Sequence, residues 1–205
     1  MYALVESGTI TKYFNYPKGF TLGELQYPAD IFMKWSVEEK EAIGIHEVVF
    51  DDSNKKDEQW YINTNQSFAF ADGTVTASYG TATPKAHADT LFTAQDETDG
   101  LGTEGEVATR GLKYNLIQTL KSQVANELAR TDWYITRNTE KSTAIPSAIS
   151  THRDAVRTKQ ASMETQITGA ADTAALETLY TYVNTGTESN PVHERPLGEL
   201  PALES

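Results

Sequence analysis

The chain has 205 residues, a formal net charge of −12 and no cysteine. The absence of cysteine excludes disulfide bonds, thiolate chemistry and cysteine-based zinc sites. The acidic balance argues against nucleic acid and against an anionic membrane surface as partners, because both are bound mainly through Lys and Arg.

The first 92 residues are predicted to form a small antiparallel β-rich domain. Short β-prone runs flank the turn signals Ser7-Gly8 and Asp72-Gly73, which predicts two hairpins. A third hairpin is expected over residues 46–64, where two β-prone runs flank a polar loop. Between these strands, residues 36–44 are predicted to form a short helix that begins with a capping box and ends at a glycine.

Residues 93–111 are rich in glycine and acidic side chains and have almost no apolar content. Such a composition buries no core, so we expect a flexible, solvated linker here. Residues 96–100 resemble part of a calcium-binding loop, but they lack the spacing of an EF-hand, and the linker interpretation is preferred.

Residues 112–183 are predicted to be helical. Apolar side chains recur at three- and four-residue spacing in a first long helix, and roughly every seven residues in a second. Asp172 is expected to cap a short third helix. The segment that joins the two long helices is short, so they are expected to form an antiparallel helical hairpin.

The connection of this hairpin, residues 131–146, holds most of the candidate site residues. We expect Trp133 and Ile145 to pack across its mouth, with Pro146 starting the next helix. Arg137, Glu140 and Arg153 are expected to form a polar cluster beside them.

Residues 184–205 form a Pro-rich tail that is expected to be extended. Leu197, Leu200 and Leu203 recur every third residue, which places them on one face of a polyproline-like segment. Ordering about ten residues costs at least as much free energy as burying three leucines contributes. The prediction is therefore that the tail binds a neighbouring subunit and does not dock on its own chain.

One stretch resembles a known family. The pattern T-D-W-Y-x-x-R-x-x-E-x-x-x-x-I-P-x-x-I-x-x-x-R-x-x-x-R looks like the C-terminal helical motif of bacteriophage tail proteins of the tail fibre assembly or tail-associated type. His152 stands where that family usually has tyrosine. The motif residues singled out as a structural or partner-binding site are Trp133, Tyr134, Arg137, Glu140, Ile145, Pro146, Arg153 and Arg157.

The resemblance implies a non-enzymatic structural component of a phage tail, located at the tail tip, the baseplate or a fibre attachment point. The alternative is an assembly chaperone that binds the fibre tip transiently and is absent from the virion. Either role implies other tail proteins as partners, in a homo- or hetero-oligomeric assembly, with no small-molecule substrate, cofactor or metal. The expected location is the virion tail, after synthesis in the cytoplasm of the host bacterium.

Overall fold

The computed structural model describes residues 1–203, and its fold is mixed α+β, with a β-rich N-terminal region and C-terminal helices. It divides into two compact units, Met1–Thr83 and the chain from Pro84 onwards. The boundary between the units therefore lies between Thr83 and Pro84. The β-rich domain was predicted to end later, at residue 92.

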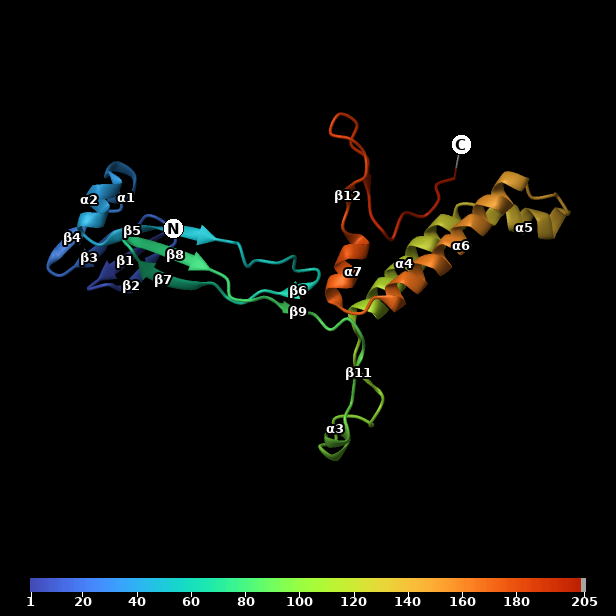
Figure 1. Cartoon of the computed structure of the whole chain (residues 1–205), viewed down its shortest axis with the longest axis horizontal. Coiled ribbons are helices and arrows are strands. Elements are labelled where there is room, and N and C mark those ends of the chain that lie inside the picture. Colours follow the sequence, from blue (N-terminus) through green and yellow to red (C-terminus); the bar gives the residue numbers. More distant parts are fainter. Residues whose placement is uncertain (204–205) are drawn as a thin grey trace. The chain divides into compact units, whose positions relative to one another are not determined.

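A five-stranded sheet forms the first unit, in the order β2-β1-β5-β8-β7 (Figure 1). Both turns predicted from Ser7-Gly8 and Asp72-Gly73 are confirmed, because each residue has the positive φ that a tight two-residue hairpin turn requires. The Ser7-Gly8 turn joins the first two strands of this sheet in chain order, and the Asp72-Gly73 turn joins its last two. The strands are β1 (Tyr2–Glu6), β2 (Thr9–Phe14), β5 (Ile45–Asp51), β7 (Ser67–Ala71) and β8 (Thr74–Ser78).

The sheet is not wholly antiparallel, because β5 and β8 pair in parallel, with Val48 opposite Val75. The hairpin predicted over 46–64 is also wrong. Strand β5 pairs with β1 and β8, whereas β6 (Tyr61–Ile62) pairs with β9 (Thr83–Pro84). The burial of Ile45 and Val48 explains why β5 lies inside the sheet. The centre of β5 is apolar, and it lies between two strands that cover both of its edges.

Two apolar clusters lie on the two sides of this sheet. On one side Leu4, Phe14 and Ile45 pack with residues of the β3–β4 hairpin and of helix α1. On the other side Ala3, Val5, Val48, Val75 and Ala77 pack together, with Phe68 and Phe70 against them. The covering elements are β3 (Phe20–Leu22), β4 (Leu25–Tyr27) and α1 (Ile31–Lys34).

The short helix predicted over residues 36–44 is confirmed as α2 (Val37–Ala42). Its capping box is complete, since the Ser36 side chain accepts from the Glu39 N–H and the Glu39 carboxylate accepts from the Ser36 N–H. Gly44 has φ +80°, and a Cβ there would lie 2.3 Å from the Val5 carbonyl oxygen. Only glycine fits this close approach between the helix exit and β1.

The stretch expected as a flexible linker is folded. Residues 90–109, called the arm below, contain strands β10 (Thr90–Leu91) and β11 (Val107–Thr109), which pair, and helix α3 (Ala94–Thr98) between them. Thr93 and Asp96 form a second capping box at the start of α3. Local hydrogen bonds, and not a buried core, order the arm, since none of the residues of α3 is buried.

The helical prediction for residues 112–183 is confirmed in its main elements. Helices α4 (Leu112–Ala129) and α6 (Ser147–Gly169) run side by side (Figure 1), and α7 (Thr173–Tyr180) is capped by the Asp172 side chain, which accepts from the Ala175 N–H. The connection between the long helices is itself helical, as α5 (Asp132–Lys141).

The tail docks on its own unit, which corrects the prediction that it does not. The chain leaves α7, forms a small hairpin of β12 (Val183–Asn184) and β13 (His193–Glu194), and returns. Leu197 is then 1% exposed, and its N–H donates to the Leu179 carbonyl at 3.0 Å. Backbone and side-chain hydrogen bonds, such as that from the Arg195 Nε to the Gly198 carbonyl, help to offset the cost of ordering the tail.

Candidate functional site

Arg153 joins the end of α4 to α6 and is 8% exposed. Its guanidinium donates to the Leu128 carbonyl at 2.8 Å and to the Thr131 hydroxyl at 2.7 Å, and it pairs with Asp132 at 2.8 Å. These contacts neutralise the partial negative charge at the C-terminus of α4 and fix the point where α5 begins. The motif residues Thr131, Asp132 and Arg153 therefore position α5.

The polar cluster expected from Arg137, Glu140 and Arg153 does not form. Arg153 faces the α4 terminus, whereas Arg137 lies over the rings of Trp133 and Tyr134, at 4.9 Å and 5.5 Å from their centroids. Glu140 is exposed on α5. The expected loop is a helix, so the four-residue spacing places Arg137 over the Trp133 ring, while Arg153 on α6 is held at the end of α4.

Trp133 is not buried as predicted, because 51% of it is exposed. Its ring centroid lies 3.7 Å from that of Tyr134, and the guanidinium of Arg137 covers both rings. The Arg137 Nε is buried and has no hydrogen-bond partner among residues 1–203. The three side chains form an aromatic–cation stack on the surface of α5.

No residue of α5 is buried in this chain, although the helix presents Trp133, Tyr134 and Ile135 in succession. A helix of this length is marginal in water without a packing partner, because most helical stability in proteins comes from burying an apolar face. Tryptophan, tyrosine and arginine are also the residues that dominate binding energy at protein interfaces. These properties make the face of α5 a candidate partner-binding surface.

The other motif residues have structural positions. Pro146 is the N-cap of α6, one position before the first turn in which it was predicted, and Ile145 is half-buried beside it. Arg157 is exposed and pairs with Asp154 at 3.3 Å. Neither Ile145 nor Arg157 contributes to the aromatic–cation stack, so the motif combines residues that shape the hairpin with residues that α5 exposes.

One side-chain contact between the long helices was not predicted from the sequence. His152 is 8% exposed, and its Nε2 lies 3.1 Å from a carboxylate oxygen of Glu127, which also binds Arg130 at 3.0 Å. No local signal marks this pair, because its members are 25 residues apart.

Residues 195–199 of the tail are held by a second cluster of side chains, at the end of α7. Arg195 lies over the rings of Tyr180 and Tyr182, at 5.4 Å and 5.6 Å, and its Nε is 2.8 Å from Glu199. The Tyr182 hydroxyl donates a hydrogen bond to Glu199, which raises the pKa of Tyr182, and burial raises the pKa of Tyr180. These contacts and the buried Leu197 anchor the tail.

The other two leucines of the tail are less buried than Leu197. Leu200 and Leu203 are half-buried, and each borders a cavity of about 430 Å³ beside the long helices. Leu203 faces α6 residues that include Ala148 and His152. The three-leucine face predicted from the spacing is therefore only partly realised, with Leu197 as its single buried member.

Within residues 1–203, no group of His, Asp and Glu side chains has the arrangement of a metal site, and no helix is long and apolar enough to span a membrane. Comparison with known proteins gives no match to a family model, to a curated protein or to a solved structure.

Replacing Trp133 by alanine is expected to change the free energy of unfolding by less than about 1 kcal/mol, because the side chain is half-exposed and supports no core. Urea unfolding of the full chain, followed by circular dichroism, measures this change. Leu176→Ala is the comparison variant, since Leu176 is fully buried and its truncation should cost about 2–5 kcal/mol. A loss of similar size from Trp133→Ala would contradict the exposed position.

Proposed function

We propose that this chain is a structural component of a bacteriophage tail, located at the tail tip, the baseplate or a fibre attachment point, and that it acts through protein–protein contacts. It stays in the virion, after synthesis in the cytoplasm of the host bacterium. Its partners are other tail proteins. It performs no catalysis in this role.

The observation that carries this proposal is the exposed stack on α5. Trp133 is 51% exposed and is held by Tyr134 and Arg137 in a fixed arrangement. Holding a large aromatic side chain in place before binding lowers the entropy lost on association. Such a preformed aromatic and cationic anchor suits a lasting contact with another protein.

Two further features support a structural role. The stack lies inside the stretch that resembles phage tail proteins, residues 131–157. The chain also divides into two compact units, each with its own packed side chains, which suits an adaptor that holds different partners. A fold alone does not define a function, so the proposal depends on the exposed surface and the resemblance together.

Mass spectrometry of purified particles tests the proposal, using a phage whose genome encodes this chain. The expected result is a fixed copy number of the chain per particle. A chain that is absent from mature particles but is needed for fibre attachment would instead be the assembly chaperone. A chain that is absent from particles and dispensable for their assembly would overturn both assignments.

A matched pair of variants connects this result to α5. Trp133→Ala should lower incorporation into particles while leaving the isolated protein folded. Val183→Ala is the control, because Val183 is similarly exposed, at 48%, but lies on β12. Equal incorporation of the two variants would exclude α5 as the contact surface.

A further inference from the structure

One side of α5 carries an aromatic residue followed by two cations. Trp133, Arg137 and Lys141 are spaced four residues apart, so they lie along one face of the helix. Glu140 adjoins them, and the other carboxylate of α5, Asp132, is paired with Arg153. Over residues 112–169, which span both long helices and α5, eight side chains are basic and five are acidic.

The arm has the complementary character. Residues 90–109 contain five acidic side chains and no basic one. The arm also exposes two leucines, Leu91 at 49% and Leu101 at 64%. An exposed leucine in a segment rich in carboxylates is the kind of surface that an aromatic ring with neighbouring cations can bind.

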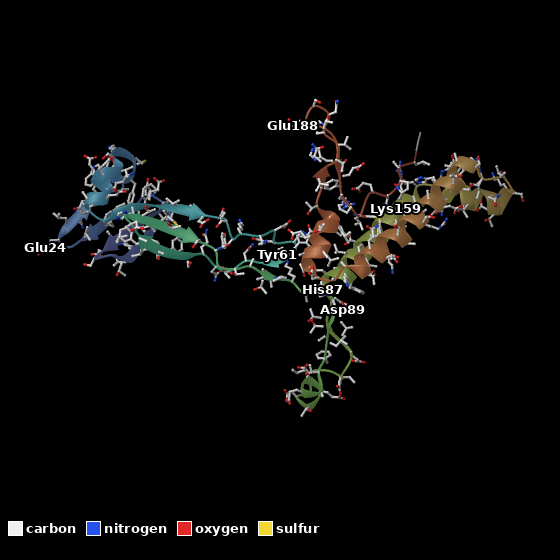
Figure 2. All side chains as sticks on the ribbon, viewed as in Figure 1. Glu24, Tyr61, His87, Asp89, Lys159 and Glu188 are labelled. Atoms are coloured by element: carbon white, nitrogen blue, oxygen red, sulfur yellow. The ribbon has the colours of Figure 1, made fainter. Side chains whose placement is uncertain are left out.

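The arm is preformed, which reduces the entropy lost when it binds. Its base is held by Asp89, labelled in Figure 2, which accepts from the Gly111 N–H at 2.8 Å and pairs with Arg110 at 2.6 Å. Within the arm, the Phe92 N–H donates to the Glu106 carbonyl at 2.9 Å. The backbone N–H of Thr93 donates to the Asp96 carboxylate at 2.8 Å and lowers the pKa of this group.

The two surfaces lie at opposite ends of α4 in the same unit. The arm joins the start of α4, where the Leu112 N–H donates to the Ala86 carbonyl, and α5 follows the end of that helix (Figure 1). The 18 residues of α4 span about 27 Å at 1.5 Å per residue. The arm and α5 of one chain are therefore separated by the length of α4, which favours a contact between two copies.

We propose that the Trp133–Arg137–Lys141 face of α5 binds the arm of a second copy of this chain, with Leu101 against the Trp133 ring and the arm carboxylates facing Arg137 and Lys141. The inference identifies the partner of the surface on which the proposed function rests. The two contacting surfaces are different, so the association is head to tail and leaves a free arm and a free α5. Further copies add until the assembly closes into a ring or continues as a filament.

A mixing experiment with two variants tests this geometry. Trp133→Ala blocks α5 but leaves the arm intact, and Leu101→Ser blocks the arm but leaves α5 intact. Sedimentation velocity should show wild-type species that grow beyond a dimer as concentration rises, whereas each variant alone stays monomeric. An equimolar mixture of the variants should form a dimer and nothing larger, because only one pair of complementary surfaces remains.

Several outcomes would overturn the inference. They are a wild-type protein that stays monomeric, a Leu101→Ser variant that associates like the wild type, and a mixture that remains monomeric. Arg137→Glu provides a second block of α5 if Trp133→Ala proves unfolded by circular dichroism. Val183→Ser, which changes an exposed residue of β12, should associate like the wild type.

Salt dependence provides an independent readout. Charge attraction between the arm and α5 is screened over about 10 Å at 0.1 M salt, so raising the salt concentration should weaken the association. Because two copies of net charge −12 also repel each other and salt screens that repulsion as well, the salt response is read against that of Lys141→Ala. A Lys141→Ala variant with the affinity and the salt dependence of the wild type would contradict the role of Lys141. These measurements use the purified protein, so their failure leaves the virion test unaffected, and absence from virions leaves self-association unaffected.

Discussion

Leu197→Ala should destabilise the helical unit by about 2–5 kcal/mol, the cost of truncating a fully buried leucine. Leu197 is 1% exposed and its backbone is bonded to Leu179, so the substitution leaves a cavity where the tail meets α7. Hydrogen exchange of the full chain, read by mass spectrometry, should show faster exchange in α7 and in the adjoining part of the tail.

Leu203→Ala is the matched control, because Leu203 belongs to the same tail but is only half-buried. Its effect on the free energy of unfolding should be clearly smaller. If the two variants were equally stable, the tail would not be anchored through Leu197, and the original expectation of a tail that binds only a neighbouring subunit would return.

Phe14→Ala should destabilise the β-rich unit by about 3–5 kcal/mol. Phe14 has no exposed surface, and its ring lies 4.9 Å from that of Phe20 and 5.2 Å from that of Phe32. It therefore connects the sheet to the β3–β4 hairpin and to α1. Urea unfolding, combined with hydrogen exchange to localise the change, measures the loss.

Tyr16→Ala is the control for this substitution, because Tyr16 is 66% exposed and its loss should fall within about 0.5 kcal/mol of the wild type. The expected increase in exchange is confined to the strands and helices around Phe14. A Phe14 variant with wild-type stability would contradict the assignment of this ring to the core.

The sequence by itself determined the features that depend on neighbouring residues. The Ser36 capping box, the Asp72-Gly73 turn and the Asp172 cap were all predicted, because each is a hydrogen bond or a backbone conformation set within a few residues. The recurring apolar positions predicted α4 and α6, because the spacing of apolar residues along a helix can be read directly from the sequence. The capping box of α3 was present in the sequence as Thr93 and Asp96 and was missed, because the composition of the stretch was given more weight.

Only the tertiary structure decided which surfaces are buried and which residues meet. The motif stretch was identified as the candidate site, but its Trp133 was expected to be buried and is exposed, because the connection forms a helix that buries none of its residues. The parallel pairing of β5 with β8, the Glu127–His152 pair and the burial of Leu197 also join residues far apart in the sequence. Such contacts depend on the sum of packing and chain entropy over the whole unit, which no local pattern contains.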